Sequence, residues 1–147
     1  TETQWFDSML KLPMEEHPLT IEVNIALPED GFAEWLPIGT CSFMAIEKIH
    51  HSAEVGIFIG DKDYWNQGFG TEAMRILLKF GFEDLNFHRI WLRVLENNHR
   101  ARKSYLKAGY LEEGRYRKAE FRHGFYNDII LMSILQDEWF TKKQKEG

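Results

Sequence analysis

Alternating apolar and polar residues predict three successive strands in the first half of the chain. Ile21, Val23 and Ile25 alternate with polar residues, which is the period of two expected of a half-buried strand. A Pro-Glu-Asp-Gly turn at 28–31 and a polar connection at 47–52 separate the strand-like segments. Three strands with such short connections predict antiparallel hairpins. The three segments are residues 19–27, 38–46 and 53–59.

Apolar residues spaced three and four positions apart predict the helices. Residues 71–85 have such an apolar stripe, with charged residues on the opposite side. Residues 98–108 predict a shorter helix, with Asn98 as its cap and Gly109 as its stop signal. Residues 1–12 predict another short amphipathic helix at the start of the sequence.

The second half of the chain returns to strands. Residues 88–95 alternate again, and residues 110–135 predict two strands joined by a turn at 123–124. The predicted order is helix, three strands, helix, strand, helix and two strands. The strand–helix–strand passage over 53–95 predicts one parallel pair with a crossover. The expected fold class is α/β (α+β): a mixed, mostly antiparallel central sheet with flanking helices, in a single domain over residues 1–147.

Composition excludes several functional classes. The chain has 18 Lys and Arg against 23 Asp and Glu, a net charge of −5, which argues against a general nucleic-acid-binding role. Cys41 is the single cysteine, so the sequence predicts no internal disulfide and no multi-cysteine zinc site. The histidines have no ligand spacing, and we expect no metal. Because no apolar run approaches the roughly 20 residues of a membrane helix and no secretory signal pattern occurs, we expect a cytoplasmic protein without a membrane partner.

A glycine-containing loop lies between the third strand and the helix over 71–85. Gly68 and Gly70 allow the backbone to turn inward and to approach a ligand closely. The free amides and the dipole of the following helix start favour an anion such as a diphosphate. The loop lacks the Lys and Ser/Thr of a phosphate-binding Walker loop and the spacing of a dinucleotide fingerprint. The alternative is that the two glycines only make a tight strand-to-helix turn.

Three segments carry a family resemblance. Residues 65–73 read Trp-Asn-Gln-Gly-Phe-Gly-Thr-Glu-Ala, and residues 98–110 fit the pattern Asn-x-x-Ala-x-x-x-Tyr-x-x-x-Gly-Tyr. Together with residues 52–57, they resemble the acetyl-CoA loop, the signature helix and the central strand of the GNAT superfamily of N-acetyltransferases. The resemblance is strongest to the branch of ribosomal-protein N-terminal acetyltransferases and spermidine acetyltransferases, and it covers about residues 19–135.

The sequence departs from the family pattern in two places. The wider superfamily usually has Gln or Arg where Trp65 stands, although an aromatic residue suits this branch. The family also has a strand and a helix before the helix that we expect over residues 1–12, and this chain is expected to lack them. Because that part of the family fold helps to line the acceptor side, the substrate pocket is expected to be incomplete or differently completed.

The resemblance implies where the cofactor binds. The strands over 53–59 and 89–95 would splay apart, and the pantetheine arm of acetyl-CoA would lie in the slot between them. This arm would pair with the backbone of Phe58 and Ile59 as an added strand does, and the diphosphate would bind the amides of residues 67–71. The cofactor-binding residues implied in this way are Phe58, Ile59, Gln67, Gly68, Phe69, Gly70, Thr71, Asn98, Lys103 and Ser104.

Transfer of an acyl group from a thioester to an amine needs proton transfers. An alkylamine with a pKa near 10.4 must lose a proton, which costs about 4.6 kcal/mol at pH 7. Glu54, a carboxylate in an apolar strand, is the candidate base, and the alternative is that it is solvated or paired with an Arg. Glu96, His50 and His51 are weaker candidates for this role.

Departure of the thiolate benefits from a proton donor. The resemblance assigns this role to Tyr105, and the alternative is a tyrosine that only packs on its helix. Residues Arg100, Arg102, Lys103 and Lys107 form a basic patch on the same helix, which is either a solvated face or an attraction for phosphates.

The expected function is that of an acetyl-CoA-dependent N-acetyltransferase, an acyltransferase acting by direct transfer in a ternary complex. Acetyl-CoA would be the cosubstrate, and the acceptor would be a primary amine: a polyamine, a protein N-terminus or another small amine. Two other readings stay open, a non-catalytic acyl-CoA-binding or sensing module and a purely structural domain. A homodimer is compatible with the resemblance, although no residue pattern requires one.

Overall fold

The computed structural model describes residue 4, residue 8 and residues 11–25, 29, 31 and 34–146. The helix expected over 1–12 and the turn expected at 28–31 fall largely outside these residues. The regular elements are η1 (Met14–Glu16), β1 (Leu19–Asn24), β2 (Trp35–Glu47), β3 (Ser52–Ile59), η2 (Lys62–Tyr64), α2 (Phe69–Lys79), η3 (Phe80–Asp84), β4 (Arg89–Leu95), α3 (His99–Ala108), β5 (Leu111–Arg122), β6 (Phe125–Leu135) and α4 (Gln136–Glu146).

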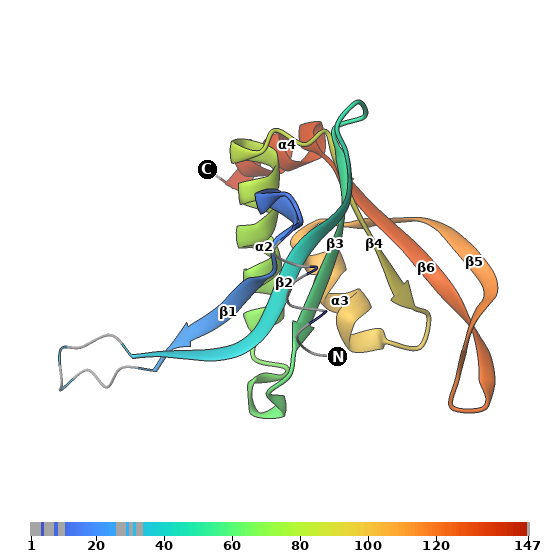
Figure 1. Ribbon diagram of the computed structural model, residues 1–147, viewed down its shortest axis with the longest axis horizontal. Helices are drawn as coiled ribbons and strands as arrows, with labels where there is room; N and C mark the ends of the chain where they lie inside the picture. The colour runs from blue at the N-terminus through green and yellow to red at the C-terminus, as the bar shows by residue number, and fades with distance from the viewer. Residues whose placement is uncertain are drawn as a thin grey trace.

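A six-stranded sheet organises the chain, in the order β1-β2-β3-β4-β6-β5 (Figure 1). All neighbouring strands are antiparallel except β3 and β4, which are parallel and joined through α2. The mixed, mostly antiparallel sheet with one parallel pair is therefore confirmed. The β5–β6 hairpin turns at 123–124, as the sequence predicts, and projects beyond the end of β4 (Figure 1).

The core lies between the sheet and α2. Met74, Leu77 and Leu78 form the buried side of α2, which confirms the apolar stripe read from the sequence. Helix α2 starts two residues earlier than predicted, and its last turn widens into η3. A side chain at Gly81 in this turn would lie 2.6 Å from Ile90 Cδ1, so the glycine permits the close approach of the turn to the sheet.

The prediction that the chain ends in two strands is wrong, because helix α4 follows β6. This helix has no continuous apolar stripe and no buried residue, so its sequence lacks the periodic signal. Tertiary contacts hold it instead: the Trp139 ring stacks on Phe82, and its Nε1 donates to Glu83 Oε2 at 3.2 Å. The Lys143 ammonium also pairs with Glu83 at 2.5 Å.

Candidate cofactor-binding and active site

The parallel strands β3 and β4 separate after three residue pairs. Ser52, Ala53 and Glu54 pair with β4, whereas the rest of β3, through Ile59, has no β4 partner. Strand β4 continues to Leu95 but stays paired with β6 over its whole length. A wedge therefore opens between the carboxyl ends of the two strands, and it leaves that edge of β3 without a neighbouring strand.

A cavity of about 560 Å³ lies at the open end of this wedge. It is bounded by the end of β3, the following loop, the start of α2 and one side of α3. The lining residues are Ile57, Phe58, Ile59, Tyr64, Trp65, Asn66, Gly68, Gly70, Thr71, Asn98, Arg100, Ala101, Lys103, Ser104, Tyr105, Lys107 and Arg122. The expected cofactor residues thus come together here, with the exceptions of Gln67 and Phe69.

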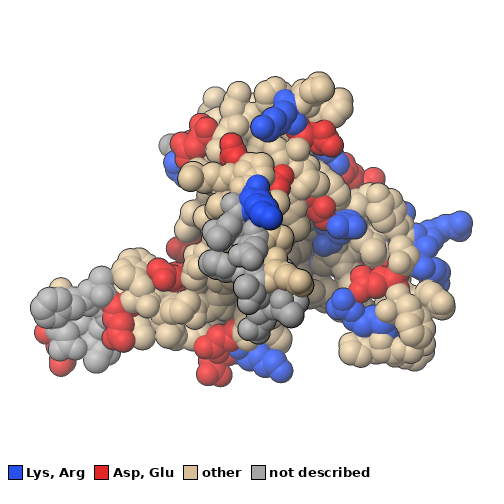
Figure 2. All heavy atoms as spheres, viewed as in Figure 1, with Lys and Arg blue, Asp and Glu red and all other residues tan. Residues whose placement is uncertain are grey.

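The charge of the cavity is opposite to that of the whole chain. Arg100, Lys103, Lys107 and Arg122 line it, and no carboxylate does among the described lining residues. Arg122 has a counter-ion outside the cavity, since it pairs with Glu120 at 2.6 Å. Figure 2 shows the same separation on a larger scale, with acidic side chains toward the β1–β2 end and more basic ones toward the β5–β6 hairpin. A net charge of −5 combined with a cationic cavity favours an anionic ligand at this place.

The glycine loop leaves the start of α2 accessible. Gly68 is the cap residue at φ 84°, a left-handed conformation that favours glycine, and no side chain caps the helix amides. A side chain at Gly70 would lie 3.5 Å from Ile59 Cδ1 and 3.7 Å from Ser104 Oγ. The hydroxyls of Thr71 and Ser104 are 2.8 Å apart and join the start of α2 to the middle of α3. These uncapped amides form an anion-binding geometry next to the cationic lining.

Helix α3 begins and ends as its sequence predicts. Asn98 Oδ1 accepts from the Ala101 amide at 3.2 Å, and Gly109 ends the helix at φ 111°. Because the cap uses the carbonyl oxygen of Asn98, its side-chain NH₂ is the group left to donate into the cavity. The cap therefore fixes both the position and the polarity of this side chain.

Tyr105 lies on the cavity side of α3 and is partly buried. Burial raises the pKa of its phenol, and the positive charge of Arg100 partly offsets this increase. The net effect keeps the hydroxyl protonated at neutral pH, which is the state that a proton donor needs. The Tyr110 ring packs beside it, with ring centroids 6.0 Å apart.

Trp65 has contacts that the sequence did not predict. Its indole Nε1 donates to the Ile59 carbonyl at 2.8 Å, and the Arg100 guanidinium lies 3.6 Å from the ring centroid. The indole thus ties the loop to the end of β3 and holds Arg100 over its face. It also occupies the Ile59 carbonyl that the expected pantetheine pairing would use. Trp65 and Arg100 are far apart in the sequence, so no local pattern predicts that their side chains stack.

Glu54 is buried at the last paired position of β3, with 7% of its surface exposed. Its carboxylate accepts from Arg93 Nε at 2.7 Å, which matches the alternative of pairing with an Arg. It is not among the lining residues of the cavity. The arrangement places it at the apex of the wedge with its charge compensated by Arg93.

Several other candidate residues lie away from the cavity. The side chain of Gln67 donates to the Asp63 carbonyl, and Phe69 packs against the core. His50 and His51 are exposed in the turn before β3, at the opposite end of that strand. Arg102, from the expected basic patch, pairs with Glu112 at 2.6 Å on the other side of α3.

Comparison with known proteins identifies the family. Residues 1–111 match the family model of the acetyltransferase (GNAT) domain, which is more than half of the chain. The protein belongs to the GNAT acetyltransferase family. This confirms the family resemblance of the motif segments, and the wedge with its glycine loop is the site at which these motifs meet.

The GNAT chain has relatives of both expected branches. It is 33% identical over 107 residues to a spermidine N(1)-acetyltransferase of Vibrio cholerae, covering 73% of this chain and 61% of that protein. It is 25% identical over 145 residues to a ribosomal-protein-serine acetyltransferase of Escherichia coli, covering 90% and 80% respectively. The chain spans 57% to 61% of the length of three curated relatives that it matches.

The fold likeness extends over nearly the whole chain. The crystal structure of a spermidine N-acetyltransferase from Vibrio cholerae in complex with CoA and spermine matches with a TM-score of 0.80 and 27% identity. This match covers 95% of the present chain and 76% of that one. The expected GNAT-like arrangement of sheet and helices is therefore confirmed.

The residues that the structure describes show neither a metal-binding cluster nor a membrane-spanning helix. They contain no group of three or more His, Cys, Asp or Glu side chains that could hold a metal ion. No helix within them is both long and apolar enough to cross a membrane.

Proposed function

We propose that this protein is an acetyl-CoA-dependent N-acetyltransferase that transfers the acetyl group directly to a primary amine. One observation carries the proposal: a cationic cavity lies where β3 and β4 diverge, beside the uncapped start of α2. An extended, polyanionic ligand fits such a site, because β3 offers an open backbone edge and α2 offers free amides.

In this proposal acetyl-CoA is a cosubstrate with its phosphates near the start of α2. The amides around Gly68, Gly70 and Thr71 would receive the diphosphate, and Lys103 and Ser104 would border it on α3. The arm would lie along Phe58 and Ile59, with Asn98 donating to it. Because the Trp65 indole already donates to the Ile59 carbonyl, the arm must displace the indole or use the second lone pair of that oxygen.

Tyr105 would act as the general acid. The amine nitrogen forms its bond to the acetyl carbon, the C–S bond breaks, and the thiolate takes the phenolic proton of Tyr105. Transfer from a phenol near pKa 10 to a thiolate of roughly Cys-like pKa 8.5 is uphill by about 2 kcal/mol in water. The positive charge of Arg100 lowers this cost by favouring the phenolate, whereas burial of the Tyr105 phenol raises it. Proton transfer concerted with cleavage of the C–S bond would avoid forming a free thiolate.

Glu54 would receive the proton that the amine loses. It stands at the apex of the wedge but does not line the cavity, so a water molecule would have to carry the proton to it. The ion pair with Arg93 also gives Glu54 a structural role that does not depend on catalysis. Loss of a base would change the pH dependence of activity, whereas loss of a purely structural carboxylate would not, so experiment can separate the two roles.

The acceptor would be a cationic amine. Relatives include enzymes named for spermidine and for a ribosomal-protein serine, and one matching structure holds spermine. A net charge of −5 favours approach of a cation from a distance, whereas the cationic cavity discourages an amine from entering by the cofactor route. The amine would therefore reach the wedge from another side.

An acceptor screen tests the proposal. Acetyl-CoA would be incubated with the protein and with spermidine, spermine or peptides that have free N-termini, and the products followed by mass. We expect a gain of one acetyl group on at least one amine with matching release of CoA. Binding of acetyl-CoA without acetylation of any amine would instead indicate a binding or sensing module. If calorimetry detects no binding of acetyl-CoA at millimolar concentration, the protein is neither an acetyl-CoA-dependent enzyme nor an acyl-CoA sensor.

A further inference from the structure

The end of β4 is fastened to β6 by Glu96. The Glu96 amide donates to the Asp128 carbonyl at 3.1 Å, and the Asp128 amide donates to Glu96 Oε1 at 3.3 Å. The side-chain carboxylate thus takes the place of a backbone carbonyl one step beyond the last β4–β6 pair, Leu95 with Ile129. Glu96 therefore extends the hydrogen-bond ladder between β4 and β6 by one residue, and it makes no such extension toward β3 within the described residues.

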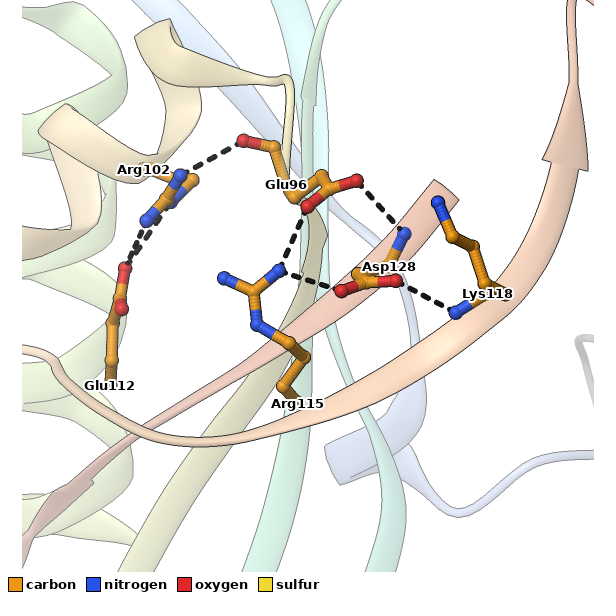
Figure 3. Close-up of polar contacts among 6 residues, drawn as sticks. All are labelled: Glu96, Arg102, Glu112, Arg115, Lys118 and Asp128. Carbon is orange, nitrogen blue, oxygen red and sulfur yellow. Dashed lines mark hydrogen bonds and ion pairs between the residues drawn. The ribbon is translucent and has the colours of Figure 1, made fainter. Parts of the chain in front are cut away.

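Arg115 of β5 completes the fastening (Figure 3). Its Nη1 donates to Glu96 Oε2 at 2.8 Å and to Asp128 Oδ2 at 2.7 Å. Asp128 Oδ1 accepts from the Lys118 amide at 2.7 Å, where β5 bulges and Lys118 adopts φ 51°. One guanidinium therefore holds two carboxylates from two strands, which otherwise would repel each other.

Helix α3 is attached to the same point. Arg102 Nη1 donates to the Glu96 carbonyl at 2.9 Å, and its Nη2 donates to Glu112 at 2.6 Å (Figure 3). The amide, the carbonyl and the carboxylate of Glu96 are thus all bonded toward β5, β6 and α3. Within the described residues, no hydrogen bond joins Glu96 to β3.

The edge of β4 that faces away from β6 has a potential partner in β3. Beyond Glu54, the edge of β3 carries backbone groups that β4 could pair by continuing the parallel register. Such pairing would close the wedge at which the cavity lies. Whether the wedge stays open depends on how firmly the end of β4 is held to β6.

We infer that the cluster of Glu96, Arg115 and Asp128 is an anchor that keeps the wedge open for the cofactor, with Arg115 as its positioning residue. The inference rests on the proposed function, because the cofactor would occupy the wedge. The anchor touches neither the cavity nor the proposed reacting groups, since none of its three residues lines the cavity. Hydrogen bonding from Arg115 and from the Lys118 amide also lowers the pKa of Asp128, which keeps this carboxylate charged at neutral pH.

Substitution Arg115→Met tests the anchor, with Arg117→Met as the matched control. Both residues are exposed on β5, and Arg117 does not belong to the cluster. We expect Arg115→Met to weaken acetyl-CoA binding about tenfold by calorimetry, with a smaller change in kcat at saturating acetyl-CoA. Arg117→Met should leave both quantities unchanged. Arg115→Lys, which retains the charge but loses the planar fork, should restore part of the affinity.

Two readouts separate an anchor from a general effect on folding. Glu96→Gln combined with Arg115→Met should weaken binding by less than the product of the two single effects, because both break one cluster. Amide exchange of residues 55–59 should slow in Arg115→Met, because closure of the wedge would protect this edge of β3. The difference between wild type and Arg115→Met should shrink at high salt, which screens exposed ion pairs.

The outcomes distinguish the anchor from the function. Wild-type-like affinity and exchange in Arg115→Met would overturn the anchor and leave the proposed acetyltransferase intact. Absence of acetyl-CoA binding in the wild type would overturn the proposed function, and the exchange of residues 55–59 would then decide the anchor alone. Faster exchange throughout the sheet in Arg115→Met would also overturn the anchor, since it would show a general loss of stability.

Discussion

Strand β4 has two flanks that differ in kind. On the β6 side it makes seven consecutive residue pairs, from Arg89–Leu135 to Leu95–Ile129, whereas on the β3 side it makes three. The closed part surrounds buried side chains such as Ile90 and Met132, each 0% exposed. The open part is lined by glycines, cations and backbone edges. The β6 side of β4 thus contributes to the stability of the core, whereas the β3 side leaves the cavity accessible.

This difference shows how the fold can open its sheet at one end, where the proposed ligand would bind, without losing its core. The three β3–β4 pairs lie beside the apolar centre, so the sheet stays continuous where burial is greatest. After the last pair at Glu54, Val55 is still buried, and the rest of β3 becomes half-buried or exposed toward Ile57 and Ile59. Substitutions on the closed flank should therefore reduce stability, and those on the open flank should reduce activity or binding.

The largest expected effect is on the closed flank. Ile90→Ala removes a fully buried side chain that pairs with Ala53 on one side and Ile134 on the other. We expect the free energy of unfolding to fall by about 2–5 kcal/mol, as measured by denaturant titration, because a cavity replaces packed atoms. Ile49→Ala is the control, since Ile49 is 88% exposed and should change stability little. A loss well below 1 kcal/mol for Ile90→Ala would contradict a closed core here.

Tyr105→Phe should have the next largest effect, on the open flank. We expect kcat to fall about 100-fold, since a general acid is lost, while acetyl-CoA affinity and stability stay the same. Tyr64→Phe is the matched control, because Tyr64 also lines the cavity but has no role in proton transfer. Equal turnover of Tyr105→Phe and wild type, in initial-rate assays of CoA release, would remove the proposed acid.

Gly70→Val should act on binding rather than on turnover. A first side-chain carbon at Gly70 makes only ordinary contacts with Ile59 and Ser104, so Gly70→Ala should be tolerated. The branched side chain of valine reaches further into the cavity, and we expect acetyl-CoA affinity to fall about tenfold by calorimetry. An affinity equal to that of the alanine variant would count against the loop as part of the cofactor site.

Glu54→Gln should have the smallest effect at pH 7, at the point where the two flanks meet. We expect roughly fivefold lower activity there and a larger loss at lower pH, because more of the amine is protonated and needs a base. Arg93→Met is the comparison variant, since it breaks the ion pair but leaves the carboxylate. Equal losses in both variants with a flat ratio across pH would show that Glu54 only stabilises the strands.

Features with local causes were predictable from the sequence. Helix α3 was predicted to within a residue because Asn98 and Gly109 act on the chain beside them. The strands of the sheet and its parallel pair followed from periodicity and from the crossover. The glycine loop was placed correctly because its position between a strand and a helix is fixed by neighbours in the chain.

Features with distant causes were not predictable from periodicity. The sequence offered pairing with an Arg as one alternative for Glu54, but it could not identify that partner as Arg93, which lies 39 residues away. The stack of Arg100 on Trp65 and the docking of α4 through Trp139 depend on side chains brought together only by the fold. The sequence offered Glu96 as a weaker candidate for the base. In the structure, its carbonyl accepts from Arg102, and its carboxylate accepts from Arg115 and from the Asp128 amide.

The unpaired edge of β3 has a consequence for how the family can diverge. A recognition surface made of peptide groups is the same whatever side chains occupy residues 57–59, so sequence drift there does not erase it. If the proposed cofactor site is right, side chains here could change while the backbone edge that receives the pantetheine arm stays the same. The feature that such substitutions would leave in place is the divergence of the β3 and β4 backbones after their third residue pair.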